Sequence, residues 1–309
     1  MLTYNEEKNL QQCLRSVSGW TESIFVIDSG SSDRTVEIAE NCGAPVFEHP
    51  FKTHTAQWCW ALESLPIRTD FVLGLDADQR VSPELRDELI WLFSQEQTRL
   101  DAAGGFYAKR RQVFRGQWIR HGGYYPKHLL KLFRRDKVFF DENDFLDHHF
   151  YVRGRIGILG NDLIEDNHNE NDIAFWIEKH NRYAQLHAKE EMLRRGNGAL
   201  ESPVKPELFG SPDQRSLWFK KRWLYLPLYV RPFLYFFYRY FFKLGFLDGK
   251  QGFIFHFLHA FWYRLLVDIH VDEMRKTGDR TGGPETEERQ MEAEKSQVEP
   301  EKFAIKESS

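Results

Sequence analysis

The chain has 309 residues, which is enough for one large domain and a smaller appendage. Its formal net charge of -4 argues against general nucleic-acid binding. Cys13, Cys42 and Cys59 show neither disulfide nor metal-binding spacing, which favours a reducing compartment. The first residues lack the basic start and apolar core of a signal peptide, so we expect a cytoplasmic protein.

The first part of the chain alternates helix and strand signals. Asn5 can cap a first helix, whose apolar residues recur at helical spacing. Residues 23–27 form an apolar run that ends at Asp28, which predicts a strand. A second helix is predicted from Asp33, as its cap, to Gly43, where it should stop.

The alternation continues through the next forty residues. Residues 46–47 and 71–75 predict strands on either side of a helix over residues 53–65. Ser82 precedes a proline and an acidic turn, which marks the start of another helix. This βαβ series predicts an α/β fold, a Rossmann-like, mostly parallel sheet between helices.

Two aspartates, Asp76 and Asp78, follow the apolar run 71–75. The two-residue period of a strand points both carboxylates the same way. A hard divalent cation, Mg or Mn, is commonly held by one or two carboxylates and by the phosphate oxygens of a substrate. The implied substrate is a diphosphate. Ligands of parallel sheets bind at the carboxyl ends of the strands, where Asp28 also lies.

Segments 3–7, 26–35 and 75–78 resemble, in order and spacing, the three nucleotide-sugar motifs of family 2 glycosyltransferases, which have the GT-A fold. Four further segments resemble the subgroup of lipopolysaccharide inner-core β-glucosyltransferases and related exopolysaccharide enzymes. These segments are 116–126, 132–135, 161–164 and 181–183.

The resemblance implies roles for individual residues. Asp28 would accept a hydrogen bond from a uracil ring, because a carboxylate only accepts such bonds. Asp76 would contact the ribose or the metal side of the diphosphate, and Asp78 would bind the metal directly. Asp28 also fits a turn former before Ser-Gly-Ser-Ser. The other residues expected at the nucleotide-sugar site from the motifs are Thr3, Asn5, Glu6, Ser29 and Gly30.

The chain departs from the family pattern at its start. Members normally have an apolar strand before the first motif, and only Met1 and Leu2 precede Thr3 here. A largely missing buried strand would leave backbone groups of its neighbours unpaired. We therefore expect the first strand to be truncated and the native start to lie upstream of Met1.

The acceptor side needs a base that takes the proton of the acceptor hydroxyl. Many relatives carry a His-Glu pair where this chain has Asp147 and His148. The candidate bases are Asp147, Asp144 and His148, with Asp147 preferred. A polar loop without a catalytic role is the alternative.

Basic residues between positions 110 and 135 suggest an anionic ligand, because guanidinium groups match phosphate geometry. Arg120 and His121 are the preferred pair, since the glycines that follow them let the backbone approach a ligand closely. Arg134 is also assigned to the nucleotide-sugar site. The full set is Arg110, Arg111, Arg120, His121, Lys131, Arg134 and Arg135.

Residues 218–269 are dense in aromatic and basic side chains, and their uncharged runs are too short to span a bilayer. This composition favours an in-plane membrane anchor. The alternative is a helical subdomain that packs on the catalytic core or forms a dimer interface. Residues 276–309 have almost no apolar side chains and are expected to be disordered.

Together these features predict a GT-A domain over residues 1–210, a helical membrane-interfacial segment over 211–275 and a tail over 276–309. The expected activity is inverting transfer of a hexose, glucose from UDP-glucose, to a lipid-linked or lipopolysaccharide-type glycan at the cytoplasmic face of the cell membrane. The alternatives are a polyprenyl-phosphate sugar transferase, whose phosphate acceptor needs no base, and a non-catalytic nucleotide-sugar binder.

Overall fold

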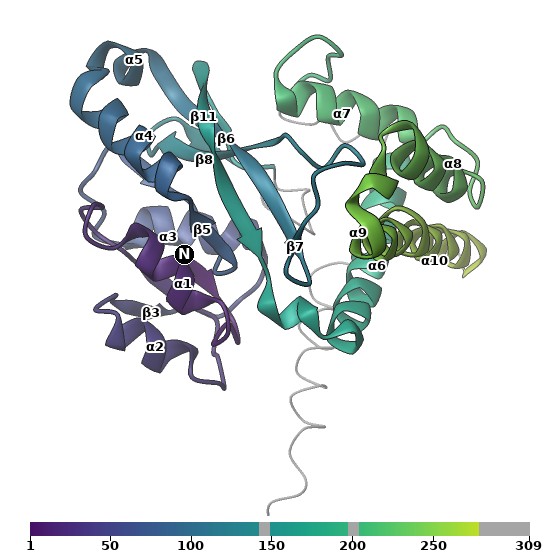
Figure 1. Cartoon of the computed structure of the whole chain (residues 1–309), viewed down its shortest axis with the longest axis horizontal. Coiled ribbons are helices and arrows are strands. Elements are labelled where there is room, and N and C mark those ends of the chain that lie inside the picture. The colour runs from purple at the N-terminus through teal and green to yellow at the C-terminus, as the bar shows by residue number, and fades with distance from the viewer. Residues whose placement is uncertain (142–148, 197–203, 278–309) are drawn as a thin grey trace, which may run out of the picture.

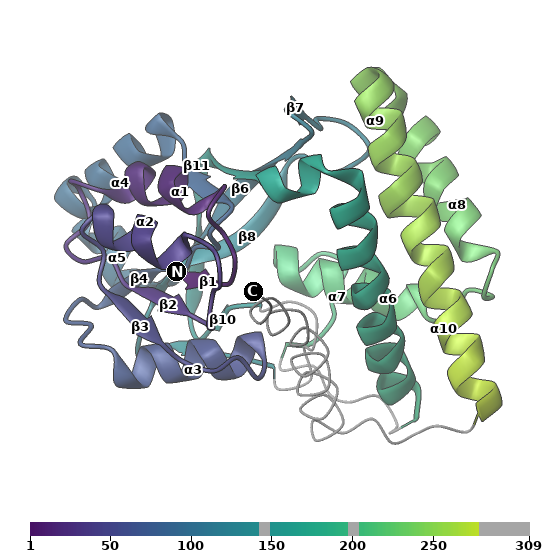
Figure 2. The ribbon, with the colours of Figure 1, turned by 90° about the horizontal axis from the view of Figure 1, so that it is seen from below.

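The computed structural model describes residues 1–141, 149–196 and 204–277. An α/β part contains the N-terminus, and a helical part starts with the long helix α6 (Ile173–Gly196) (Figure 1). The view from below separates the two parts clearly (Figure 2). The expected α/β fold with a helical C-terminal appendage is confirmed. The predicted bases Asp144, Asp147 and His148 and the tail from residue 278 lie outside the described residues.

A parallel sheet of three short strands begins the α/β part. Thr3 pairs with Asp28 and Leu2 with Ile27, so the ends of the first two strands lie at one edge of the sheet. An isolated parallel bridge between Leu2 and Asp76 joins this sheet to the segment that bears the aspartates. The strands, in spatial order, are β1 (Leu2–Thr3), β2 (Val26–Asp28) and β3 (Val46–Glu48).

Helices cover both faces of this sheet. Val26 packs in one cluster with Leu10 and Ala39, whereas Ile27 packs in another with Ala61. Successive strand residues point to opposite faces, so the two clusters lie on opposite sides. This arrangement confirms the predicted βαβ series. The helices are α1 (Leu10–Val17), α2 (Thr35–Asn41) and α3 (His54–Ser64).

The helix starts predicted at Thr53 and Ser82 are correct, and the caps predicted at Asn5 and Asp33 are wrong. The N-cap of α2 is Arg34, without a side-chain cap, and Asp33 Oδ1 instead accepts a hydrogen bond from the Thr35 amide at 2.9 Å. The Ser82 hydroxyl accepts a hydrogen bond from the Leu85 amide, and Thr53 caps α3 in the same way. Asn5 does not cap α1, which begins at Leu10. Asn5 adopts a left-handed backbone conformation, φ 54°, a turn geometry that asparagine tolerates.

A second, mixed sheet follows, with the spatial order β4-β8-β6-β11-β5. Strands β6 and β11 are parallel, and the other neighbours in this order are antiparallel. A short strand, β7 (Gln117–Trp118), pairs with β6, and β9 (Val138–Phe139) pairs with β10 (Tyr151–Val152). The main strands are β4 (Phe71–Leu73), β5 (Gln79–Val81), β6 (Ala103–Phe114), β8 (Lys127–Arg134) and β11 (Arg155–Asp166).

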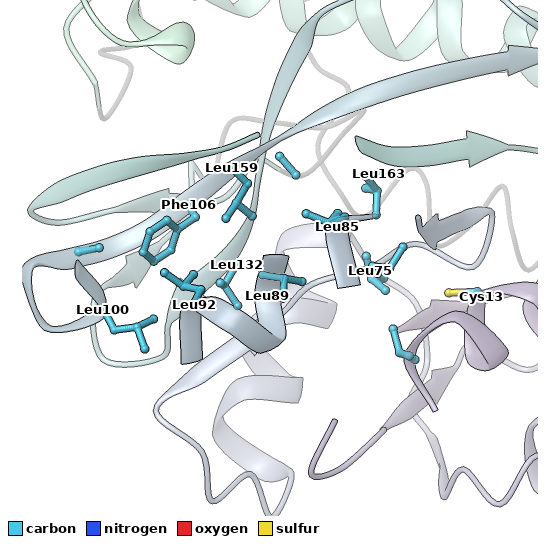
Figure 3. Packing of buried hydrophobic residues seen from close by; sticks show 14 residues of the cluster. Cys13, Leu75, Leu85, Leu89, Leu92, Leu100, Phe106, Leu132, Leu159 and Leu163 are labelled. Atoms are coloured by element: carbon cyan, nitrogen blue, oxygen red, sulfur yellow. The ribbon is translucent and has the colours of Figure 1, made fainter. Parts of the chain in front are cut away.

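The largest core cluster lies between this sheet and α4 (Pro83–Gln95), which α5 (Gln97–Ala102) follows (Figure 3). Leu85, Leu89 and Leu92 of α4 are spaced four and three residues apart and therefore share one face. They pack with residues of the sheet, with Leu75 and with Cys13 of α1. Leu75 directly precedes Asp76, so the core holds the aspartate segment in place. The sheet residues of the cluster include Phe106, Leu132, Leu159 and Leu163.

The helical part is built on the pairing of α6 with the last helix, α10 (Tyr263–Thr277). Ala184 and Ala188 of α6 pack with Val267 and Val271. The two helices lie side by side (Figure 2). Helix α6 precedes the boundary predicted at residue 210, and the division into domains stays a prediction. The remaining elements are η1 (His168–Asn171), α7 (Pro212–Trp223), α8 (Arg231–Phe237), η2 (Tyr238–Phe242), η3 (Gly245–Asp248), α9 (Gly249–His256) and η4 (Phe257–Trp262).

A buried ion cluster connects α8 to α6 and α10. The Arg231 side chain is fully buried and donates to Asp268 of α10 at 2.6 Å and to both Glu191 oxygens of α6 at 2.9 and 3.0 Å. Removing one member of such a cluster leaves an uncompensated buried charge. None of the described helices is long and apolar enough to cross a bilayer.

The His256 ring is buried among Gly122, Gly245 and Arg239. Burial, aided by Arg239, lowers the pKa of His256 from 6.5 to about 4. Below pH 6.5 the unfolded chain binds a proton that the folded chain takes up only near pH 4, so stability falls across this window. Between these pH values, wild type should lose about 3 kcal/mol more unfolding free energy than His256→Asn.

Urea denaturation at several pH values measures this difference. The other buried titratable groups are present in both proteins, so their effects cancel in the comparison. If the free energy of unfolding changes equally with pH in the two proteins, the pKa of His256 is not lowered by folding.

Candidate active site

The first two predicted motifs meet around the carboxylate of Asp28. Its Oδ2 accepts hydrogen bonds from the amides of Gly30, at 2.9 Å, and Ser31, at 2.7 Å. Its Oδ1 accepts from the hydroxyls of Ser31, at 2.6 Å, and Thr3, at 3.0 Å. Asp28 is 1% exposed. The structure therefore shows Asp28 in the turn-forming role, and its contact with a uracil ring stays a prediction.

Asn5 and Glu6 extend this connection. The Asn5 amide donates to the Ser31 hydroxyl at 2.9 Å, and its side-chain oxygen accepts from the Ser32 amide at 2.8 Å. The Glu6 amide donates to the Thr35 hydroxyl at 2.7 Å. Burial raises the pKa of the Glu6 carboxyl group. The segment after β1 and the loop after β2 thus form one hydrogen-bonded unit.

Gln57 of α3 braces the same loop from the other side. Its amide donates to the hydroxyl of Ser29 and to the backbone oxygen of His49, both at 3.0 Å. Gln57 is fully buried, so α3 holds the loop against the sheet. The predicted residues Thr3, Ser29 and Gly30 therefore lie together, which agrees with their assignment to one site.

Asp76 is paired with a lysine from a neighbouring strand. Lys131 of β8 is 5% exposed, and its ammonium group lies 2.8 Å from Asp76 Oδ2. The Asp76 amide donates to Gln79 Oε1 at 3.2 Å. A positive charge beside the first aspartate therefore forms part of the site.

Asp78 lies in more acidic surroundings. Its Oδ2 accepts a hydrogen bond from the Asn167 amide at 3.1 Å. Burial first, and then the charges of Glu165 and Asp76, raise the pKa of Asp78. Glu165 is itself held by Arg110, at 3.0 Å, and by the Gln79 amide, at 2.9 Å. Several carboxylates thus surround one position with few cations to balance them.

This donor set fits a hard divalent cation. Among the described residues, no group of three or more histidine, cysteine or acidic side chains forms a ready metal centre. Mg is usually bound through one or two carboxylates and completes its shell with water and substrate phosphates. Asp78 and Asp76 supply such carboxylates, and burial, with the neighbouring negative charges of Glu165 and Asp76, raises the pKa of Asp78.

The sequence analysis missed three residues of this site. Glu165 lies at the end of β11, and Asn167 directly follows that strand. Lys179 of α6 forms an ion pair with Glu170 at 2.8 Å, and its positive charge lowers the pKa of Asp78. The sequence places these residues about 90 to 100 positions from Asp78. Only the parallel register of β6 and β11, and the pairing of β11 with β5, bring them there.

Arg134, Arg120 and His121 lie elsewhere. Arg134 pairs with Phe71 at the start of β4, the end away from Asp76, and its guanidinium approaches Asp70 at 3.6 Å. Arg120 stacks on the ring of Trp118, 4.6 Å from its centre. His121 contacts the turn before α9. These contacts of the three side chains lie away from the nucleotide loops, and the nucleotide-sugar role of the three residues stays a prediction.

Comparison with known proteins identifies the family. The model of the family described as glycosyl transferase family 2 matches residues 1–155, just over half of the chain. The chain belongs to glycosyl transferase family 2. A protein of Rickettsia bellii described as an uncharacterized glycosyltransferase is 37% identical over 100 residues, which is 32% of this chain and 33% of that protein. One from Rickettsia conorii is 39% identical over 94 residues, 30% of this chain and 33% of its own.

The match therefore spans about a third of the length of these curated relatives.

Solved structures with a similar arrangement include Pyrobaculum calidifontis mannosyltransferase PcManGT, determined with GDP-Man and Mn2+. It is 12% identical, with a TM-score of 0.46 over 90% of this chain and 86% of that one. S. aureus TarS with UDP is 17% identical, with a TM-score of 0.41 over 90% of each chain.

Replacing Asp28 by alanine removes a buried acceptor of four hydrogen bonds. We expect Asp28→Ala to lower the free energy of unfolding by about 3 kcal/mol, because its donors, the buried Thr3 hydroxyl among them, are left without this partner. Asp28→Asn keeps an oxygen acceptor and should cost less. Chemical denaturation measures both. Unchanged stability of Asp28→Ala would mean that the carboxylate does not organise the loop.

Proposed function

We propose that this protein is a metal-dependent inverting glycosyltransferase that moves a hexose, glucose from UDP-glucose, to a lipid-linked or lipopolysaccharide-type glycan. The observation that carries this proposal is the position of Asp76 and Asp78 beside the Thr3 and Asp28 loops. An edge of a sheet that presents a hydrogen-bonded loop and two carboxylates suits a nucleoside diphosphate with a bound cation.

Different residues of the chain would bind the nucleoside, the cation and the diphosphate. The loop from Asp28 to Ser31 and the segment from Thr3 to Glu6 would hold the nucleoside, with the uracil at Asp28. Asp78, with Asp76, would hold Mg or Mn, and the bound cation would stabilise the charge of the leaving UDP. Lys131, beside Asp76, adds a positive charge where the diphosphate would lie.

The acceptor hydroxyl needs a base, for which Asp147 is proposed, with Asp144 and His148 as the alternatives. A polyprenyl-phosphate acceptor is a second candidate, because a phosphate acceptor needs no base. A non-catalytic nucleotide-sugar binder is the third. Transfer from UDP-glucose to a glycan hydroxyl, to a lipid phosphate or to neither acceptor separates these three functions.

Asp78→Asn should abolish transfer, because it removes the proposed metal ligand, while the fold stays intact at this edge of the sheet. The measurement is release of UDP from UDP-glucose with Mn or Mg present. Asp70→Asn, at an exposed position beside Arg134, is the matched control and should keep full activity. Turnover near the wild-type rate in Asp78→Asn, or in excess EDTA, would contradict the metal-dependent mechanism.

We also propose that the segment 211–275 binds the surface of the inner face of the cell membrane. Support comes from an apolar tip at the turn between η2 and α9, where large side chains are exposed to solvent. Phe242 is 79% exposed and Leu247 55%. Rings and aliphatic side chains of this kind, near basic residues, suit the interfacial layer of a bilayer. The apolar tip consists of Phe241, Phe242, Leu244, Phe246 and Leu247.

The double variant Phe242→Ser, Leu247→Ser should fail to float with anionic vesicles, because the apolar contribution to binding is lost. High salt should release wild type only partly, since apolar burial is not screened. Phe209→Ser is the control: Phe209 is 97% exposed but precedes α7, outside the apolar tip. If wild type does not float and the double variant loses a dimer by light scattering, the surface is an oligomer interface.

A further inference from the structure

The loop between β7 and β8 is fastened to the turn that carries the apolar tip. This loop leaves the α/β part and reaches α9 (Figure 2). The Gly122 amide donates to the backbone oxygen of Lys243 at 2.8 Å, and Arg239 donates to the Gly122 oxygen at 2.7 Å. Gln117 donates to the backbone oxygen of Asp248 at 2.7 Å. The residues that form these contacts are 117 to 131 positions apart in the sequence.

Gly122 makes this contact possible. Its φ is 69°, and a Cβ atom built there would lie 1.9 Å from Cε1 of His256. Gly245, on the turn, meets the same ring at 2.6 Å. The imidazole of His256 therefore fills the space between the two glycines. Larger side chains at either glycine would push the loop and the turn apart.

Asp248 holds one side chain of the loop in a defined orientation. Its Oδ1 lies 2.7 Å from Nδ1 of His121, and its Oδ2 accepts from the His121 amide at 2.9 Å. The Asp248 side chain is 3% exposed, whereas that of His121 is 37% exposed. A buried carboxylate that bonds Nδ1 leaves Nε2 available for a ligand.

The surroundings of His121 are cationic. The Lys243 stem lies 3.8 Å from the position that a Gly123 Cβ would take, and the Arg239 guanidinium lies 3.5 Å from it. Within the described ranges, Lys243 has no carboxylate partner, and its ammonium group lies 5.6 Å from the centre of the Tyr238 ring. Lys243 belongs to the same turn as the apolar tip. A lysine and an oriented imidazole therefore lie at the base of the apolar tip.

We propose that His121 and Lys243 bind the phosphate of an anionic membrane lipid, and that Asp248 is the positioning residue of this site. The inference rests on the proposed membrane association. The apolar tip would enter the bilayer, which brings its base to the level of the head groups, where basic side chains meet phosphates. Through the loop, the same contact would hold the α/β part at a fixed height above the membrane.

The Asp248→Asn variant distinguishes this site from general charge attraction, because the two predict opposite changes in the affinity for anionic vesicles. Removing an acidic residue makes the protein more positive, so general attraction predicts tighter binding to anionic vesicles. A site that needs an oriented His121 predicts weaker binding instead, by about fivefold, the equivalent of one basic contact. The assay is flotation with phosphatidylcholine vesicles, with and without phosphatidylglycerol.

His121→Gln should weaken binding to phosphatidylglycerol vesicles as much as Asp248→Asn, and the double variant no further, because both changes remove one interaction. Lys250→Gln is the matched control on the adjacent helix turn and should have the smaller effect of a general surface charge. Binding to pure phosphatidylcholine should stay unchanged in all variants, which shows that they fold and keep the apolar tip.

Two outcomes overturn the inference in distinguishable ways. If wild type floats but Asp248→Asn binds phosphatidylglycerol vesicles as tightly or more tightly, the phosphate site is wrong and membrane association stands. If wild type floats with neither vesicle type, both the site and the membrane association are wrong. Neither result bears on sugar transfer, which the Asp78→Asn assay tests separately.

Discussion

The parallel register of β1 is the constraint on which the site depends. Leu2 pairs with Ile27 on one side and bridges Asp76 on the other, and Thr3 lies beside Asp28. Because parallel strands end at the same edge, this register brings the first motif, the loop after β2 and the two aspartates together. The rest of the α/β part supports that edge. Helices α1 and α4 pack behind Leu75, and Gln57 braces the loop at Ser29.

Charge balance is uneven along this edge. Asp76 has Lys131 as a close partner, and Asp28 is satisfied by amides and hydroxyls of its own loop. Asp78 is held by a neutral amide and lies near Glu165, so its negative charge is the least compensated of the three. The cation proposed for this site would lower the repulsion and keep the carboxyl group of Asp78 ionised.

The helical part is connected to the α/β part by polar contacts as well as by packing. Phe255 of α9 packs with Phe114 of β6 and Trp176 of α6, and the Asp248 turn holds the loop at His121. The buried Arg231 cluster then ties α8 to α6 and α10. Movement of the apolar tip relative to the sheet would require several of these contacts to break together. The proposed membrane contact and the candidate active site would therefore be mechanically connected.

The sequence by itself determined most of the local structure. Caps at Thr53 and Ser82, the stop at Gly43 and the helical spacing of Leu10, Cys13, Leu14 and Val17 each depend on residues close in the chain. The motif resemblance also led to the family, because the motifs are short and contiguous. The same local logic failed at Asn5, where hydrogen bonds to Ser31 and Ser32 replace a helix cap.

Only the tertiary structure decided which distant groups complete the site. Lys131, Glu165, Asn167 and Lys179 reach the aspartates through strand pairing and through the entry into α6, and no local pattern encodes those pairings. The same holds for His121 and Asp248, which are 127 residues apart. A side chain's partner across the fold depends on sheet register and helix packing, which are properties of the whole chain. The sequence therefore specified the hydrogen-bonding and charged groups, and the tertiary structure determined which of them pair.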